Sequence, residues 1–380
     1  MSTIRDIRIV GLECSVPDDQ AYGMARGLTS RRGGGLVLLE TEDGVTGIGE
    51  AWGPVGLTSA YLAVVKQYFV GTSVFAQRGV QHHVYAKHYH FGSQGTLVAL
   101  FSGIDIAAHD AMGKLLGRPV CDLIGGRQRD RVAVYGSGGY FTLDADQGVA
   151  LERQLEAVKG RGFRAFKIKI GRNPTDDEAR VRLTRRVLGD NIMLAVDSNG
   201  NYTLDQALES MRRIAPFNIG WYEEPLAPQD WEGYQRLRKR SPIPIATGEA
   251  LYETFDFRRL VDTGCADVLQ PDLALCGGLS VARFVGELAL SAHLRVSPHV
   301  WGTSVGLAAA VHWVASLPAY PHAGNDPTPT LVEYDTGVNP LRDNLLQSPL
   351  LAVDGFIAVP TGPGLGIQLD EKMIERFAVR

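Results

Sequence analysis

Short apolar runs alternate with helical stretches over the second two thirds of the chain. Segments such as Asp177–Leu188 and Leu279–Ala292 carry apolar residues at steps of three and four, and a short β-rich run separates each from the next. This alternation is typical of βα units, whose strands lie parallel. We therefore predict a barrel of eight strands. The expected strands are Val132–Tyr135, Ala165–Ile170, Ile192–Val196, Ile219–Tyr222, Ile245–Gly248, Asp267–Gln270, Arg295–Ser297 and Leu331–Tyr334.

The beginning and the end of the chain follow other patterns. Ile4–Leu12 alternates, Gly35–Glu40 reads as a second strand, and Leu97–Leu116 has helical periodicity, which together predict an antiparallel α+β part. The tail from about Pro349 is rich in turn residues and is expected to return to this part. We predict three segments: a capping domain at residues 1–130, a barrel at residues 131–348 and a returning tail at residues 349–380.

Composition excludes several classes of protein. The 380 residues have 45 % hydrophobic content and a formal net charge of -4, which leaves no basic footprint for nucleic acid or for a membrane surface. The N-terminus lacks the apolar core of a signal peptide, and no stretch reaches the length of a membrane span. The four cysteines form no CxxC or zinc-like cluster. We expect a soluble, cytoplasmic protein with reduced thiols.

Two lysines lie two positions apart on the second expected strand. Lys167 and Lys169 share one face, while Phe166, Ile168 and Ile170 share the other. Because the apolar set must face the helices of a barrel, both ammonium groups point inward, which is costly unless carboxylates or a metal site neutralise them. Taken alone, the same pattern also fits an exposed edge strand.

Three acids close the next three expected strands. Asp197, Glu223 and Glu249 stand where catalytic groups of barrels are found, at the C-terminal strand ends. Oxygen donors suit a hard cation, and Mg²⁺ takes octahedral oxygen coordination with room for substrate and water. A single acid there more often caps the following helix. Three in succession behind a lysine pair favour a metal site.

The following two strands end in a carboxylate and an imidazole. Asp272 beside His299 would fix the tautomer of the imidazole and raise its basicity, as a general base requires. The other eight histidines have no matching acid at a strand end. Those within His82–His90 fall in the expected capping domain, where metal binding is the less favoured reading and contact with substrate stays open.

The ordered set Lys-x-Lys, Asp, Glu, Glu, Asp, His and Glu333, behind an α+β part, resembles the mandelate racemase subgroup of the enolase superfamily along essentially the whole chain. The resemblance implies a modified TIM barrel, (β/α)7β-like, with an N-terminal α+β capping domain that the C-terminal tail completes. It also implies one Mg²⁺ per subunit, bound by Asp197, Glu223 and Glu249, which chelates the substrate carboxylate.

The resemblance also implies roles for the remaining charged residues. Lys169 would be a base on one face of the substrate α-carbon, and His299, paired with Asp272, an acid or base on the opposite face. Lys167 would support Lys169, and Glu333 would hydrogen-bond the developing enediolate, for which it must be protonated. Because like charges disfavour protonation, we expect Lys167 to lower the pKa of Lys169. Cation and fixed donors would stabilise the enediolate as it forms.

The step after proton removal depends on other parts of the sequence. The stretches His299–Thr303, Val332–Asp335 and Gly362–Gly366 are most similar to galactarolactone cycloisomerases, and next to acid-sugar dehydratases. We therefore favour β-elimination from a sugar acid or its lactone over racemisation or epimerisation. A non-catalytic barrel that binds sugar acids would not need two bases beside three metal ligands, and a Schiff-base aldolase would need one lysine in an apolar pocket.

Substrate choice is assigned to loops of the capping domain. The expected lid is Pro17–Gly35, whose glycines permit movement and whose arginines, Arg26 with Arg31 and Arg32, would meet a second carboxylate of the substrate. The alternative is a solvated basic loop. The other expected substrate contacts are Asn199, Trp52 and Trp301. The expected partners are a small carboxylate or lactone and further copies of the same chain.

Overall fold

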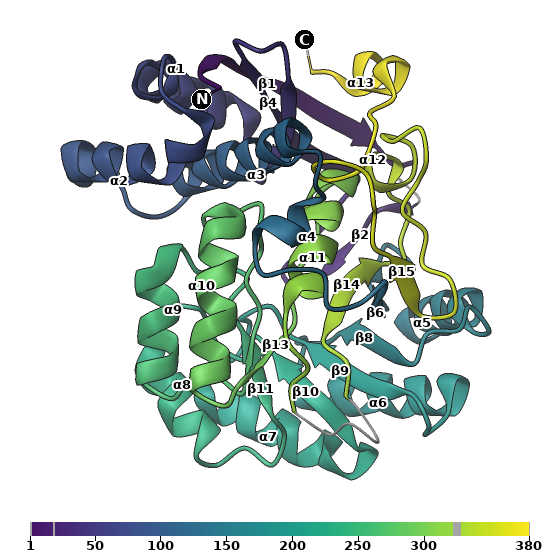
Figure 1. Ribbon diagram of the computed structural model, residues 1–380. Coiled ribbons are helices and arrows are strands. Elements are labelled where there is room, and N and C mark those ends of the chain that lie inside the picture. The colour runs from purple at the N-terminus through teal and green to yellow at the C-terminus, as the bar shows by residue number, and fades with distance from the viewer. Residues whose placement is uncertain (1, 18–19, 322–327, 380) are drawn as a thin grey trace.

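The computed structural model describes residues 2–17, 20–321 and 328–379, and it contains an α+β part above a barrel (Figure 1). The predicted Asp18 and Asp19 of the lid lie outside the described residues. In the barrel, strands run in the order β13-β12-β11-β10-β9-β8-β6-β14, and all the neighbouring pairs are parallel. The barrel strands are β6 (Arg131–Gly138), β8 (Ala165–Lys169), β9 (Met193–Asp197), β10 (Ile219–Glu223), β11 (Ile245–Thr247), β12 (Val268–Leu269), β13 (Arg295–Val296) and β14 (Leu331–Asp335).

All eight predicted strands are present, with ends that differ by up to three residues. The seam between β13 and β14 carries no strand ladder, but Ser297 Oγ donates to Leu331 O at 2.7 Å across it. The barrel is therefore nearly closed. Its outer helices are α5 (Gln147–Val158), α6 (Pro174–Leu188), α7 (Leu204–Ile214), α8 (Trp231–Arg238), α9 (Glu253–Asp262), α10 (Gly278–Ser291) and α11 (Ser304–Ser316), with a 3-10 turn η4 (Ala215–Phe217).

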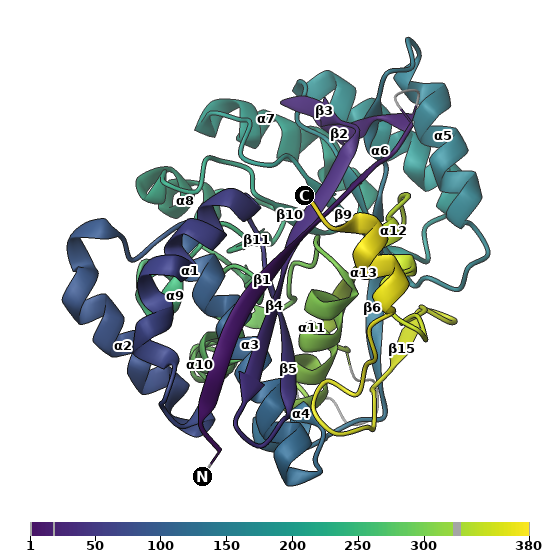
Figure 2. The same ribbon diagram turned by 90° about the horizontal axis from the view of Figure 1, so that it is seen from above.

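The N-terminal part is an antiparallel sheet in the order β1-β4-β5, which lies across the barrel when seen from above (Figure 2). Helix α3 lies directly on β5 because Gly47 and Gly49 leave room for it: a Cβ on Gly47 would come within 2.0 Å of Ala107 O. The elements are β1 (Ile4–Ser15), β4 (Arg31–Thr41), β5 (Thr46–Ala51), α1 (Val55–Phe69), η2 (Val74–Ala76), α2 (Gln77–His88), η3 (Tyr89–Phe91), α3 (Thr96–Leu116) and α4 (Val120–Leu123).

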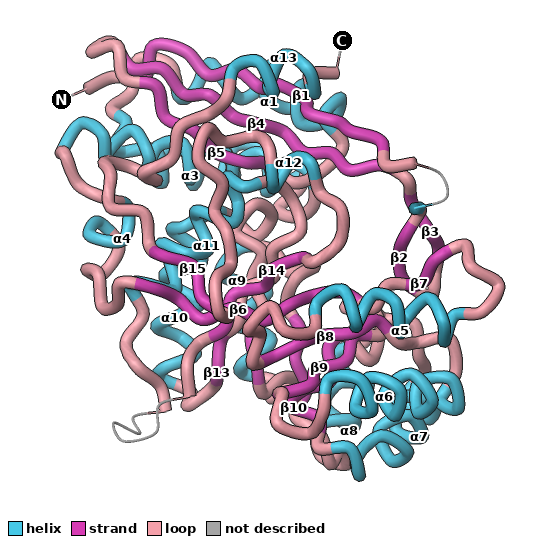
Figure 3. The backbone as a smooth tube through the Cα atoms, turned by 90° about the vertical axis from the view of Figure 1, so that its right-hand side faces the viewer, coloured by secondary structure: helices cyan, strands magenta, loops and turns pink. Residues whose placement is uncertain are grey.

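The expected lid forms a hairpin beside the barrel. Strand β2 (Tyr22–Met24) pairs with β3 (Gly27–Thr29) on one side and on the other with β7 (Phe141–Thr142), which follows the first barrel strand (Figure 3). The C-terminal tail contacts both parts: β15 (Phe356–Ala358) pairs with β6, and α13 (Glu371–Phe377) lies near β1. The short helix α12 (Pro340–Asp343) comes before both in the chain. The division of the chain at residues 130 and 348 stays a prediction.

Apolar side chains form separate layers. One core lies between the barrel strands and their helices, and another between the N-terminal sheet and α1 to α3. Inside the barrel, Tyr135 and Trp221 fill the space left by Ala165, Ala195 and Ala246. This aromatic layer fills the interior of the barrel, so the polar groups at the C-terminal strand ends lie above apolar side chains.

Candidate active site

The predicted charged residues meet at the C-terminal ends of the barrel strands. Lys167 and Lys169 lie on β8, Asp197 and Glu223 end β9 and β10, and Glu333 lies on β14. Glu249, Asp272 and His299 follow β11, β12 and β13 within two or three residues. Lys167, Asp197 and Glu223 are completely buried. The arrangement places both signs of charge together, away from water.

Three of the acids form one cluster. Asp197, Glu223 and Glu249 each offer an oxygen, and these oxygens all lie within 4.8 Å of one another. Within the described chain, Oε2 of Glu249 is buried without a hydrogen-bond partner. Three carboxylates at this spacing, one of them with an unpaired oxygen and all in a site with more acids than bases, are chemically suited to a hard divalent cation. The residues present therefore fit the magnesium site that the sequence predicts.

The two lysines bind the acids from below. Lys167 donates to Glu223 and lies 2.9 Å from Glu333 Oε1, while Lys169 Nζ donates to Asp197 Oδ2 at 2.5 Å. Burial lowers the pKa of Lys169, and Lys167 lowers it further, but the charges of Asp197, Glu249 and Glu223 together leave the net pKa raised. The predicted lowering by Lys167 is thus present, but the surrounding carboxylates outweigh it.

His299 and Asp272 form the predicted pair. His299 Nδ1–H donates to Asp272 Oδ2 at 2.7 Å, and the other oxygen of Asp272 accepts from Ala274 N at 2.8 Å. Nε2 of the ring lies 3.6 Å from Glu249 Oε2, too far for a hydrogen bond. Burial lowers the pKa of His299, but Glu249, Glu333 and Asp272 raise it to about 10. The nitrogen that faces the acid cluster is thus the one free to exchange a proton.

Glu333 is ionised in this arrangement. Burial raises its pKa, but Lys167, His299 and Lys169 together lower it to about 2. Its Oε2 accepts from Val300 N at 3.1 Å, beside the histidine. The pKa of Glu333 is therefore low in the absence of substrate, and its protonation beside an enediolate stays a prediction.

The expected substrate contacts lie in different surroundings. Asn199 is buried with φ 47°, and its Oδ1 has no hydrogen-bond partner among the described residues. The ring of Trp52 lies 6.3 Å from that of His299, edge to face. Trp301 packs beneath the lid hairpin, with ring centres 5.9 Å from Tyr22 and 5.8 Å from Tyr140. Asn199 and Trp52 therefore both border the charged cluster, because the backbone N–H of Asn199 donates to Asp197 Oδ1 at 2.8 Å.

The lid arginines separate. Arg26 is exposed at the turn between β2 and β3, and Arg31 is exposed 3.4 Å from Glu13. Arg32 is buried: its guanidinium lies 2.8 Å from Asp335 and 4.8 Å from the ring of Trp301. Arg32 therefore connects the lid region to the end of β14. The residues next to Arg32 in the sequence did not predict this contact. Contact between Arg26 and a substrate stays a prediction.

Sequence reasoning missed residues that support the cluster from outside it. Trp221 and Gln270 both donate to Glu223, and Glu50 of β5 accepts from Thr303 and Gly306 at the start of α11. Trp221 and Gln270 each stand two residues before a predicted site residue, which is the spacing of side chains on one strand face. This two-residue spacing is the feature of the sequence that could have identified Trp221 and Gln270.

The histidines of His82–His90 lie on α2 and η3, in the N-terminal part. His88 Nε2 lies 3.0 Å from the hydroxyl of Tyr68. Over the described residues, the acid cluster of the barrel is the one group of three or more His, Cys, Asp or Glu side chains with metal-binding spacing. Metal binding by these histidines therefore has no support in the geometry.

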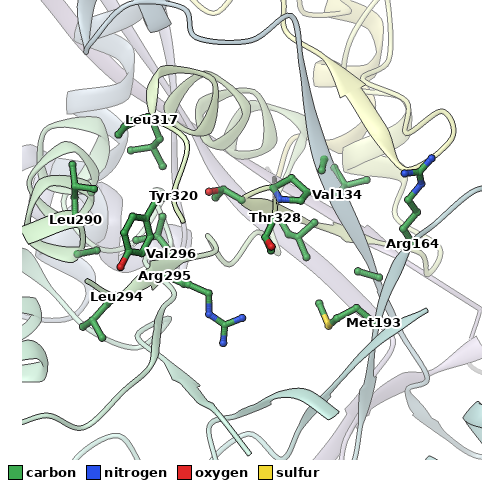
Figure 4. A pocket seen from close by; sticks show the side chains of 18 of the residues that line it. Val134, Arg164, Met193, Leu290, Leu294, Arg295, Val296, Leu317, Tyr320 and Thr328 are labelled. Atoms are coloured by element: carbon green, nitrogen blue, oxygen red, sulfur yellow. The ribbon is translucent and has the colours of Figure 1, made fainter. Parts of the chain in front are cut away.

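A separate apolar cavity of about 280 Å³ lies at the opposite end of the barrel (Figure 4). Its lining includes Val134, Met193, Leu294 and Leu331 near the starts of the strands, with the side chain of Arg295 inside it. None of the charged residues of the cluster lines this cavity. It is therefore distinct from the candidate active site.

Two family models cover most of the chain. The mandelate racemase/muconate lactonizing enzyme N-terminal domain matches residues 13–125, and the enolase C-terminal domain-like model matches residues 150–373. A D-galactarolactone cycloisomerase of Agrobacterium fabrum is 34 % identical over 91 % of this chain and 92 % of its own length. An arabinonate dehydratase of Saccharolobus solfataricus is 29 % identical, over 89 % of each chain.

Solved structures agree over the whole length. A 3,6-anhydro-D-galactonate cycloisomerase from Zobellia galactanivorans superposes with a TM-score of 0.88 and 29 % identity, covering 100 % of both chains. A racemase from Streptomyces coelicolor with bound magnesium has a TM-score of 0.87 and 26 % identity, covering 99 % of this chain and 100 % of its own.

None of the described helices combines the length and the apolar character that crossing a membrane requires.

Proposed function

Because this chain belongs to the mandelate racemase/muconate lactonizing enzyme family of the enolase superfamily, we propose that it removes the proton next to the carboxylate of a sugar acid or its lactone. The chain is an enzyme of this superfamily, and its relatives named above are two cycloisomerases, an arabinonate dehydratase and a racemase. The proposed reaction continues by β-elimination, either opening a lactone ring or expelling water.

One observation carries the proposal: two proton-transfer groups stand at the same barrel mouth, one on each side of an acid cluster. Lys169 comes from β8 and His299 follows β13, with the four strands β9 to β12 between them along the sheet. The acids of that cluster end or follow β9, β10 and β11, the strands in between. A substrate carboxylate held at the cluster would therefore present its α-carbon between the two groups.

Asp197, Glu223 and Glu249 would hold Mg²⁺ in this proposal. Bound there, Mg²⁺ would supply positive charge beside the substrate carboxylate, where negative charge develops as the α-proton leaves. Lys167, which already lies between Glu223 and Glu333, adds a second positive charge in the same buried place. Burial strengthens these interactions because little water remains to screen them.

His299 would exchange its proton through Nε2, since Nδ1 is occupied by Asp272. Lys169 would act from the other side of the α-carbon after releasing Asp197. In β-elimination one of them takes the α-proton, the C–H electron pair becomes the new Cα–Cβ π bond, and the β-oxygen leaves with its electron pair. The other group supplies the proton to that oxygen, so charge and protons balance.

The test is solvent deuterium exchange at the α-carbon across a panel of sugar acids and lactones, followed by detection of 2-keto-3-deoxy acids. We expect Mg²⁺-dependent exchange on at least one substrate, and its loss in whichever of Lys169→Met and His299→Asn removes the group that faces the α-proton of that substrate. Arg153→Met serves as a control, because Arg153 is an exposed cation on α5. Exchange without a keto-deoxy product or opened lactone would indicate racemisation or epimerisation instead. No exchange, no keto-deoxy product and no opened lactone on any substrate would overturn the proposal.

A further inference from the structure

The floor beneath the acid cluster contains two neutral N–H donors aimed at one oxygen. Gln270 Nε2 donates to Glu223 Oε2 at 2.6 Å, and Trp221 Nε1 donates to the same oxygen at 3.1 Å. The other oxygen, Oε1, accepts from Lys167. Glu223 is thus held by one oxygen from below, while its second oxygen belongs to the charged cluster.

Packing fixes both donors. Trp221 is 3 % exposed, and its ring stands edge to face on Tyr135 with centres 5.3 Å apart. Gln270 is 1 % exposed, and its backbone N–H donates to Thr247 O at 3.0 Å, which ties it to the neighbouring strand. Neither side chain has free space in which to turn, so their N–H groups keep their direction.

The amide of Gln270 is held at a cost. Its Oε1 is buried and has no hydrogen-bond partner among the described residues. Leaving a buried acceptor unpaired costs about 1–3 kcal/mol. Turning the amide over would place Oε1 against the carboxylate oxygen of Glu223, which repels it. The unpaired Oε1 is therefore explained if the function of Gln270 is to donate its N–H to Glu223.

Neutral donors do something that the lysines cannot. Lys167 compensates the charge of Glu223 and so competes with any other cation for it, whereas an indole or amide N–H orients the carboxylate and leaves its negative charge in place. Two such donors on one oxygen also restrict rotation of the carboxyl plane. Outer partners of this kind typically change the affinity of a metal site 10- to 100-fold.

We propose that Trp221 and Gln270 are positioning residues, which set the divalent-cation affinity of the site by orienting Glu223 and touch neither the substrate nor the cation. The inference rests on the proposed function, because it takes Glu223 as a ligand. It predicts that loss of either N–H weakens cation binding and leaves turnover at saturating cation close to that of the unaltered enzyme.

The experiment compares Trp221→Phe and Gln270→Met with two matched controls. Trp313→Phe removes a buried indole N–H on α11 that has no hydrogen-bond partner among the described residues, and Gln81→Met removes a buried amide that donates to Phe101 O in the N-terminal part. The dissociation constant for Mn²⁺ is measured without substrate from the free-ion signal in electron paramagnetic resonance. Thermal unfolding of each metal-free variant is recorded in parallel.

We expect Mn²⁺ to bind about 10- to 100-fold more weakly in Trp221→Phe and in Gln270→Met, with both controls within threefold of the unaltered enzyme. Excess Mn²⁺ should bring kcat back to within about threefold. If either floor variant fails to fold, the other still decides the question. Unchanged Mn²⁺ affinity in a folded floor variant would overturn the inference. An unaltered enzyme that binds no Mn²⁺ would instead overturn the proposed function.

Discussion

Replacing Asp272 with Asn tests the assignment of His299 as a proton-transfer group. In Asp272→Asn the side chain keeps its size, and its carbonyl oxygen can still accept from Ala274 N, as Asp272 Oδ1 does at 2.8 Å. The amide nitrogen then replaces the oxygen that accepts from His299 Nδ1–H at 2.7 Å. Two donors would face each other, so the ring must change tautomer and carry its proton on Nε2.

The expected loss follows from these two contacts. A hydrogen bond to a charged group contributes roughly 1.5–3 kcal/mol, which is about 10- to 150-fold in rate. The tautomer change adds to this because Nε2 can no longer accept a proton, and a positioned acid or base typically contributes about 10²- to 10⁴-fold. We therefore expect kcat of Asp272→Asn to fall by at least about 100-fold.

The assay separates the two sides of the α-carbon. Deuterium exchange is followed with each of two substrates that are epimers at this carbon, so that one presents its proton to His299 and the other to Lys169. Only the His299-dependent exchange should be lost. Asp370→Asn, at the N-cap of α13, is the control for an Asp-to-Asn change. Equal loss of both exchanges, or more than a third of the activity retained, would refute the role given to the dyad.

Three further predictions concern stability and cation dependence. His312 accepts from Cys121 N and contacts Leu365 O, and burial lowers its pKa from 6.5 to about 4. Because the unfolded chain binds this proton more tightly, protonation favours unfolding. The unfolding free energy should therefore drop by about 3 kcal/mol between pH 6.5 and 4. Urea unfolding checks this, and an unchanged pH slope in His312→Gln would contradict it. Arg32→Gln should lower the unfolding free energy by about 1–3 kcal/mol because Asp335 loses its nearer cation and keeps the more distant Arg342, at 3.7 Å. Adding Asp335→Asn should recover part of it, and full stability of the single variant would argue against the pair. Treatment with a chelator should abolish α-proton exchange and lower the thermal midpoint, with Mg²⁺ restoring both; a midpoint indifferent to Mg²⁺ would speak against the site.

The barrel and the charged residues at its mouth were predictable because each rests on a local pattern. Lys167 and Lys169 are two positions apart on one strand, and the acids each end an apolar run, so strand geometry alone brings them to one face. Their protonation was not predictable. The net pKa of Lys169 and of Glu333 depends on which charged atom is nearest, and that distance is set by residues far away in the sequence.

The roles of long-range partners were also beyond the sequence pattern. Arg26, Arg31 and Arg32 are equivalent as a basic stretch, yet only Arg32 is buried, because it meets Asp335 at the end of a strand some 300 positions later. The carboxylate of Glu50 stands in an ordinary Gly-rich strand and acquires its function only through the backbone of α11. Both residues connect the N-terminal part to the barrel, and contacts between such distant segments leave no periodic signal.

These connections explain why the N-terminal part and the His299–Asp272 pair must act together. Glu50 accepts from Thr303 N at 2.9 Å, four residues after His299. Two residues further along β5 and its extension, Trp52 N donates to Ala274 O at 2.9 Å, and the N–H of Ala274 holds Asp272. The ring of Trp52 meanwhile faces His299. The Glu50–Trp52 segment of the N-terminal part thus contacts the chain on both sides of the His299–Asp272 pair. A shift of this segment would therefore move His299. We therefore expect substitutions in the Glu50–Trp52 segment to displace the His299–Asp272 pair as well.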